Sequence, residues 1–224
     1  MTIEAVLFDL DGTLVDTAPD LVRVLNDMLR ERSLAPMPYA VARNEVSNGA
    51  IGLIRLGFGS RCNDSEISGL VERFRECYMR NICLDSMIFS SFHSIFDDLH
   101  EKQRPWGIVT NKPQAMTDAL LARLDIDAAP GCVIGGDRLA ERKPHPAPLH
   151  LAAAELGVAA DRCVYVGDSP NDIEAGRAAG MRTVAAAYGY IRPNDNPHGW
   201  GADAVASHSR DIMATLARLD ATLR

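Results

Sequence analysis

Short apolar segments alternate with amphipathic ones along most of this chain. The apolar runs predict six strands, most of them apolar on both faces, as in strands covered by helices on both sides: Ile3–Phe8, Trp106–Val109, Cys132–Ile134, Cys163–Val166, Thr183–Ala187 and Ala204–Ala206. Amphipathic patterns opened by proline predict three helices between them: Pro113–Leu124, Pro146–Leu156 and Pro170–Ala179. This βαβ alternation predicts a mostly parallel sheet with right-handed crossovers.

One long segment interrupts the alternation. From about Thr17 to Ile88 no clear strand pattern occurs. Two helical patterns, Pro19–Arg32 and Glu66–Arg80, are instead joined by a segment rich in glycine and asparagine around Ser47–Gly59. We therefore predict two domains, a catalytic core formed by residues 1–16 and 89–224 and a small helical cap formed by residues 17–88.

Composition narrows the possible partners. The chain has 224 residues, of which 47% are hydrophobic, and its formal net charge is −7. A nucleic-acid-binding surface needs concentrated positive charge, so this balance argues against nucleic acid as a partner. It does not exclude a small anionic substrate, because a local cluster of cations can oppose the overall sign.

Localisation is expected to be cytoplasmic. The first residues contain acids where a signal peptide would be basic, and no apolar run approaches the ~18 residues of a membrane span. The five cysteines form no CxxC pair or metal-ligand spacing, which is typical of free thiols in a reducing compartment. The oligomeric state is not indicated.

Acidic residues follow two of the predicted strands. Asp9 and Asp11 come directly after the first strand, and Asp168 and Asp172 follow the strand that begins at Cys163. The carboxyl ends of parallel strands form the ligand crevice of an open sheet, so these acids should meet there. Two like charges ~4 Å apart cost roughly 4 kcal/mol at an intermediate dielectric, so the cluster predicts a hard cation with oxygen ligands, Mg²⁺. For Asp172 alone, a helix-capping role with Ser169 is an equal alternative.

Three further residues would suit a phosphate group. Thr110 and Asn111 end the strand Trp106–Val109 just before a predicted helix, where free N–H groups bind phosphate oxygens. Lys143 lies before another predicted helix, between Arg142 and Pro144, and could supply a positive charge. Taken alone, a solvated surface position is the simpler interpretation of this lysine.

Together these motifs resemble those of the haloacid dehalogenase superfamily. The matching segments occur in the family's order: Asp9-Leu10-Asp11-Gly12-Thr13, Thr110-Asn111, Lys143-Pro144 and Gly167-Asp168-Ser169 with Asp172. The resemblance spans the chain and implies a Rossmann-like, three-layer α/β/α core. The insertion between the first two motifs is similar to the helical cap of the phosphoglycolate phosphatase branch.

The resemblance also implies a set of roles. Asp9 would be the nucleophile, Asp11 the general acid and base, and Thr110, Asn111 and Lys143 the phosphate ligands. Mg²⁺ would be held by Asp9, the Asp11 backbone carbonyl and Asp168, with Asp172 supporting the site through water. The implied reaction is hydrolysis of a small phosphomonoester through a phosphoaspartate.

Three other functions are rivals of this hydrolysis. Dehalogenases of the superfamily lack an acid at the position of Asp11, so dehalogenation is disfavoured. A sugar phosphomutase would use the same four motifs and stays open as the alternative. A catalytically silent binding module is disfavoured by the intact acidic set.

The substrate is expected to be set by the cap. Tyr188–Pro197 and Trp200–Asp203 resemble a subgroup that includes phosphatases of phosphoglycolate and of N-acetylmuramic acid 6-phosphate. Both compounds carry a carboxylate beside the phosphate. The candidate residues for substrate specificity are Ser47 and Asn48, which the resemblance places at the active site, and Arg43 and Arg55, the nearest arginines.

Overall fold

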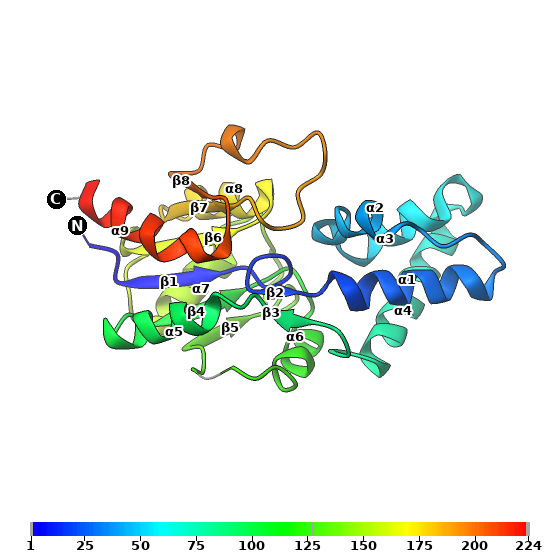
Figure 1. Ribbon diagram of the computed structural model, residues 1–224, viewed down its shortest axis with the longest axis horizontal. Coiled ribbons are helices and arrows are strands. Elements are labelled where there is room, and N and C mark those ends of the chain that lie inside the picture. The colour runs from blue at the N-terminus through cyan, green and yellow to red at the C-terminus, as the bar shows by residue number, and fades with distance from the viewer. Residues whose placement is uncertain (1, 127, 223–224) are drawn as a thin grey trace.

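Six parallel strands form the central sheet of the computed structural model, which describes residues 2–126 and 128–222 (Figure 1). Their order is β5-β4-β1-β6-β7-β8, and every pairing is parallel. Their bounds are β1 Ala5–Phe8, β4 Trp106–Val109, β5 Cys132–Ile134, β6 Cys163–Gly167, β7 Arg182–Ala186 and β8 Ala204–Ala206. All six predicted strands are confirmed, with small shifts at their ends.

Helices cover both faces of this sheet. Successive side chains of a strand point to opposite faces, so Val6 and Phe8 pack in one apolar cluster and Ala5 and Leu7 in another. The first cluster contains residues of α5 and α9, and the second contains residues of α7 and α8. The helix bounds are α5 Phe92–Glu101, α6 Gln114–Leu121, α7 Ala147–Leu156, α8 Pro170–Ala178 and α9 Ile212–Thr222. The predicted three-layer α/β/α core is confirmed.

A second lobe is inserted between β2 and β3 (Figure 1). It consists of α1 Ala18–Glu31, α2 Tyr39–Arg43, α3 Gly49–Phe58 and α4 Asp64–Arg80. We propose that this lobe is the predicted cap, residues 17–88. The predicted glycine-rich connection is in part the helix α3, so two inserted helices were too few. The apolar residues Leu53, Ile54 and Phe58 are buried and offset the cost of the helical glycines.

Two short strands connect the lobes. β2 (Val15–Asp16) and β3 (Met87–Ile88) pair antiparallel, so the chain enters and leaves the cap through adjacent segments. The prediction of no strand between Thr17 and Ile88 was wrong at β3. A two-residue strand has no detectable periodicity, and only its pairing with β2 defines it.

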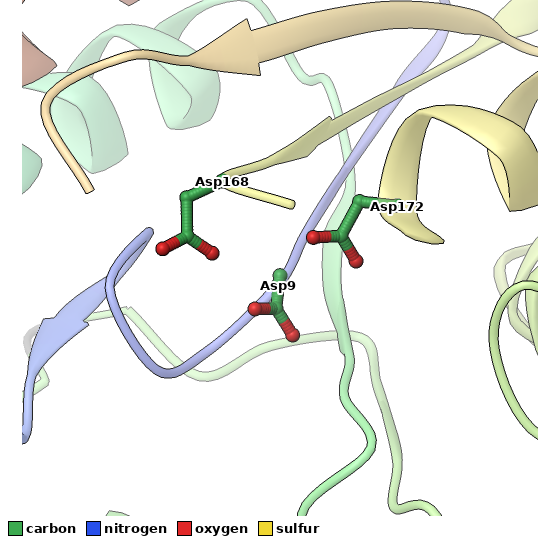
Figure 2. Close-up of side chains that lie close together, drawn as sticks. All are labelled: Asp9, Asp168 and Asp172. Atoms are coloured by element: carbon green, nitrogen blue, oxygen red, sulfur yellow. The ribbon is translucent and has the colours of Figure 1, made fainter. Parts of the chain in front are cut away.

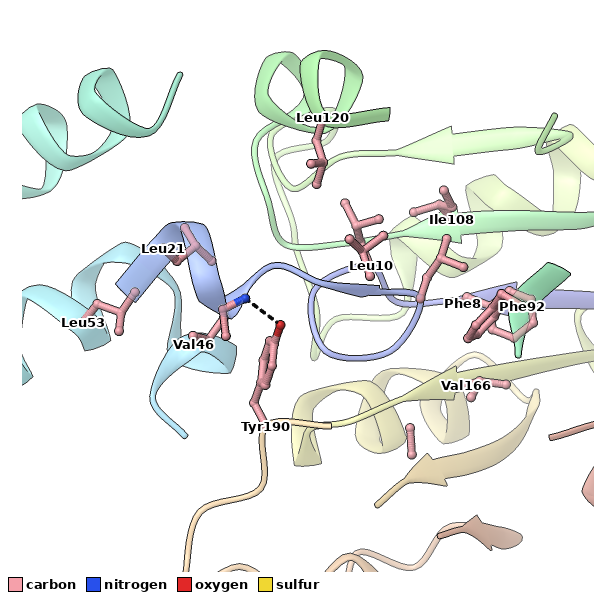
Figure 3. Packing of buried hydrophobic residues seen from close by; sticks show 14 of the residues in the cluster. Phe8, Leu10, Leu21, Val46, Leu53, Phe92, Ile108, Leu120, Val166 and Tyr190 are labelled. Carbon is pink, nitrogen blue, oxygen red and sulfur yellow. Dashed lines mark hydrogen bonds between the residues drawn. The ribbon is translucent and has the colours of Figure 1, made fainter. Parts of the chain in front are cut away.

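One apolar cluster extends from the sheet into the cap (Figure 3). It includes Phe8 and Phe92 of the core, whose rings lie 5.2 Å apart edge to face. On the cap side it includes Leu21, Val46 and Leu53.

Among the described helices, none is both long and apolar enough to cross a membrane.

Candidate active site

Three neighbouring strands bring the candidate residues to one edge of the sheet. β1 lies between β4 and β6, and the chain continues from their carboxyl ends into Asp9, Thr110 and Asp168. Asp172 lies in the first turn of α8, just after β6. Residues separated by more than 100 positions therefore meet because parallel pairing aligns the strand ends.

The carboxylates of Asp9, Asp168 and Asp172 converge (Figure 2). One oxygen from each lies within 4.8 Å of the others, and all three residues are buried. Burial is the largest cause that raises the pKa of Asp9 to about 7; Lys143 opposes the shift and Asp172 adds to it. Burial, with the charges of Asp9 and Asp172, also raises the pKa of Asp168 well above its ordinary value. The cluster therefore favours any further positive charge.

Lys143 supplies one such charge from within the protein. Its Nζ lies 2.7 Å from Asp9 Oδ1, 2.7 Å from Asp172 Oδ1 and 2.6 Å from the Tyr165 hydroxyl. The side chain is 3% exposed, so the solvated-surface interpretation was wrong. The Asn111 amide donates to the Lys143 carbonyl oxygen at 2.9 Å and helps to hold this segment.

The remaining charges fit a divalent cation. With all three carboxylates ionised, one ammonium would leave an excess of two negative charges, which a divalent cation would balance. Asp168 Oδ2 accepts hydrogen bonds from Tyr190 N at 2.7 Å and Ser47 Oγ at 3.1 Å, whereas Asp168 Oδ1 is buried without a partner among the described residues. An orphaned carboxylate oxygen beside Asp9 matches the oxygen ligands preferred by hard divalent cations.

Asp172 also has the capping role that was the alternative. Its Oδ2 accepts hydrogen bonds from Ser169 N at 3.0 Å and Ser169 Oγ at 2.6 Å, while its Oδ1 contacts Lys143. The two oxygens thus serve the helix start and the charge cluster separately.

Glycines permit close approach around Asp168. Gly12 has φ +86°, a conformation that favours glycine, and a Cβ there would collide with Asp168 Oδ2 and the Tyr190 ring. A Cβ at Gly189 would collide with the Asp168 side chain. Gly189 was not predicted as a site residue, although it lies within the segment Tyr188–Pro197 that carries the subgroup resemblance.

Asp11 is held by two neighbours. Its Oδ1 accepts hydrogen bonds from Thr17 Oγ1 at 2.6 Å and Lys112 Nζ at 3.0 Å. Lys112 Nζ also lies 4.5 Å from the centre of the Tyr78 ring, which belongs to α4 of the cap. Lys112 was not predicted, although its position directly after Thr110-Asn111 was an available signal.

A cavity of about 400 Å³ opens above these groups, between core and cap. Every predicted catalytic, metal and phosphate residue lines it: Asp9, Asp11, Thr110, Asn111, Lys143, Asp168 and Asp172. The cap contributes the predicted residues Ser47 and Asn48. It also contributes Phe74, Arg75 and Tyr78 of α4, which were not predicted.

The two predicted arginines lie elsewhere. Arg43 donates to the Gly189 carbonyl oxygen at 3.0 Å and covers the Tyr190 ring at 4.8 Å from its centre. Arg55 lines a separate surface cavity with Glu45 and Arg192. Among the described residues of the cap, the arginine that lines the cavity of the acids is Arg75.

A parallel sheet with a buried carboxylate cluster at its carboxyl edge, beneath an inserted helical lobe, defines the class of an α/β enzyme with an acidic site. The family model described as haloacid dehalogenase-like hydrolase matches residues 6–186. The chain belongs to this family.

Relatives with assigned names align over most of the chain. An N-acetylmuramic acid 6-phosphate phosphatase of Pseudomonas aeruginosa is 35% identical over 218 residues, covering 97% of this chain and 96% of its own. A phosphoglycolate phosphatase of Xanthomonas campestris pv. campestris is 43% identical over 201 residues, or 90% of each chain. The crystal structure of a predicted phosphoglycolate phosphatase from Haemophilus somnus 129pt superposes with a TM-score of 0.84 at 27% identity, covering 96% of this chain and 98% of that one.

Proposed function

We propose that this protein is a Mg²⁺-dependent phosphatase that hydrolyses small phosphomonoesters through a phosphoaspartate on Asp9. The observation that carries the proposal is the buried contact of Asp9 with Lys143 beside the unpartnered Asp168 Oδ1. Phosphatases among the relatives support the reaction class.

The nucleophile and the proton carrier are separate aspartates in this scheme. An Asp9 carboxylate oxygen attacks phosphorus, the ester P–O bond breaks, and Asp11 gives its proton to the leaving oxygen. Water then attacks phosphorus with Asp11 taking one of its protons, which releases inorganic phosphate and restores Asp9. Thr17 and Lys112 keep the Asp11 carboxylate in one orientation.

The negative charge of the transferring phosphoryl group must be offset by nearby positive charge. Asp9, Asp168 and the Asp11 backbone carbonyl would hold Mg²⁺, with Asp172 supporting the site through water. When bound, the ion would offset negative charge on the transferring phosphoryl oxygens. Lys143, Thr110 and the Asn111 backbone would hold the same oxygens.

The cavity has room for a sugar-sized leaving group. Its volume of about 400 Å³ lies within the roughly 300–1,000 Å³ typical of small-molecule sites. N-acetylmuramic acid 6-phosphate is therefore the candidate to test first, beside 2-phosphoglycolate. Both carry a carboxylate, for which Arg75 of the cap and Arg142 of the core are cations at the cavity wall; we propose Arg75, because it lies on the cap.

Phosphate release from a substrate panel tests this function. The panel contains N-acetylmuramic acid 6-phosphate, 2-phosphoglycolate and glucose 6-phosphate, each with Mg²⁺ or with EDTA. We expect turnover only with Mg²⁺, greatest for the first compound. Asp9→Asn should abolish turnover, whereas Asp27→Asn, an exposed acid paired with Arg30, should not.

Acid-quenched digestion followed by mass spectrometry should find one phosphoryl group on the peptide that carries Asp9. Phosphate release that persists in Asp9→Asn would refute the nucleophile. Formation of a sugar phosphate isomer without free phosphate would instead support the mutase alternative.

A further inference from the structure

Tyr190 lies in the loop after β7, outside the acid cluster, yet it contacts both Asp168 and the entrance to the cap. The residue is 2% exposed. Its backbone N–H donates to Asp168 Oδ2 at 2.7 Å. One residue thus connects a candidate ion ligand to the segment through which the chain enters the cap.

The Tyr190 hydroxyl holds the start of α1 (Figure 3). It accepts hydrogen bonds from Thr17 N at 2.7 Å and Ala18 N at 2.9 Å, and it donates to Asp16 Oδ1 at 2.9 Å. The first N–H groups of a helix have no partner inside the helix, and a side chain at its start normally binds one. Thr17 does not cap α1, because its hydroxyl donates to Asp11 instead. A tyrosine more than 170 residues away therefore fills this role.

The cap contacts the same loop from its other side. Arg43 of α2 lies over the Tyr190 ring and donates to the Gly189 carbonyl oxygen at 3.0 Å. Ser47 of the cap donates to Asp168 Oδ2, the oxygen that also accepts from Tyr190 N. The cap is therefore joined to this part of the core by two contacts, one from Arg43 to Gly189 and one from Ser47 to Asp168.

We propose that Tyr190 is a positioning residue that couples the position of the cap to the orientation of Asp168. Rotation of the cap about β2 and β3 would move Thr17 and Ala18 away from the Tyr190 hydroxyl and leave buried N–H groups without a partner. The orientation of Asp168 that Tyr190 holds and the observed position of the cap would then occur together, as one conformational state. A divalent ion that binds Asp168 stabilises that state, and by linkage this cap position strengthens ion binding. This inference rests on the ion site of the proposed function.

Hydrogen–deuterium exchange of residues 15–21, with and without Mg²⁺, tests the coupling in the full-length protein. In the wild type we expect Mg²⁺ to slow exchange of this segment about tenfold, within the range of roughly 5–150-fold typical of coupled sites. In Tyr190→Phe the segment should exchange about tenfold faster, because two buried N–H groups lose their acceptor. Added Mg²⁺ should then change its exchange less than about twofold.

Tyr188→Phe is the matched control. It removes a hydroxyl from the same loop, one that donates to the Thr13 carbonyl oxygen at 2.9 Å and, among the described residues, makes no hydrogen bond to α1. Its Mg²⁺ response should equal that of the wild type. An unchanged Mg²⁺ response in Tyr190→Phe, or an equal loss in Tyr188→Phe, overturns the proposal.

Arg43→Ala tests the cap side of the contact independently, since Arg43 is half-buried and its loss leaves Tyr190 intact. It should reduce the Mg²⁺ response in the same direction, and an unchanged response counts against the coupling.

Calorimetry of Mg²⁺ binding to the wild type separates the proposed ion site from the proposed coupling. Absence of binding refutes the ion site itself, whereas binding without slower exchange of residues 15–21 refutes only the coupling.

Discussion

The core and the cap contribute to the same cavity in different ways. The core supplies a charge cluster that is almost inaccessible: Lys143, Asp168 and Asp172 are each no more than 4% exposed. The cap supplies side chains that reach solvent, such as Asn48 and Arg75, whose side chain is 40% exposed. Groups at strand ends are held by the sheet, whereas groups on the inserted helices can vary without disturbing it. We infer that the core determines the reaction and the cap determines the leaving group.

Substitution of a core acid should have the largest effect and should not depend on the substrate. Asp168→Asn removes one charge from the cluster, so we expect kcat/KM to fall about 10³-fold for every phosphoester and the apparent Mg²⁺ affinity to fall about 10–100-fold. Kinetics over a Mg²⁺ titration would measure both. Asp161→Asn, an exposed acid before the same strand, is the control. A loss confined to one substrate would contradict the division between core and cap.

Lys112 tests the boundary between the two lobes, because it contacts Asp11 of the core and Tyr78 of the cap. Lys112→Met removes the cation that orients Asp11, so kcat should fall about 10–100-fold for small and large substrates alike. Lys102→Met removes a surface lysine paired with Asp98 and should have little effect. Equal activities of the two variants would refute the role of Lys112 in orienting Asp11.

Arg75 tests substrate selection by the cap. Arg75→Ala should raise KM about tenfold for a carboxylated substrate, and less than about twofold for p-nitrophenyl phosphate, because only the former loses a charge-assisted contact. Arg55→Ala is the matched control, since Arg55 lies on the cap but lines a different cavity. Equal changes for both substrates would exclude a role for Arg75 in reading the carboxylate.

Asp20 tests the internal stability of the cap, where it joins α1 to the segment before β3, through stability and not through activity. Burial acts to raise its pKa, but hydrogen bonds from Ser86 and Arg23 outweigh that effect and hold the pKa below 3.8. Its stabilisation is therefore complete above the unfolded value of 3.8 and is lost as the pH falls through the lower folded value. Asp20→Asn should lower the free energy of unfolding by about 1–3 kcal/mol at neutral pH.

Urea unfolding at neutral pH and at about pH 3 would measure that difference, which should shrink in acid. Asp27→Asn, on the exposed side of the same helix, is the control. A deficit that grows as the pH falls would contradict the assigned direction of the Asp20 pKa.

Several features of the fold and the site could be predicted from local patterns. Apolar runs identified all six strands of the sheet, and acids directly after two of those runs identified Asp9 and Asp168. These signals are readable because a buried strand must be apolar along its length, and a charge there marks its end. Parallel pairing then requires that such ends lie at one edge.

Other features exist only because distant segments pack together. The sequence alone did not determine whether Lys143 is solvated or buried; its contacts with Asp9 and Asp172 show that it is buried. The same holds for Tyr190, whose partners at Thr17 and Ala18 come from the other end of the chain. The sequence does not distinguish the arginines of the cap from one another. Only the packing of α2, α3 and α4 decides which arginine lines the cavity of the acids. Local composition thus determined the strands and their terminal acids, whereas tertiary packing decided the partners of each charge, because those depend on distances that sequence separation does not define.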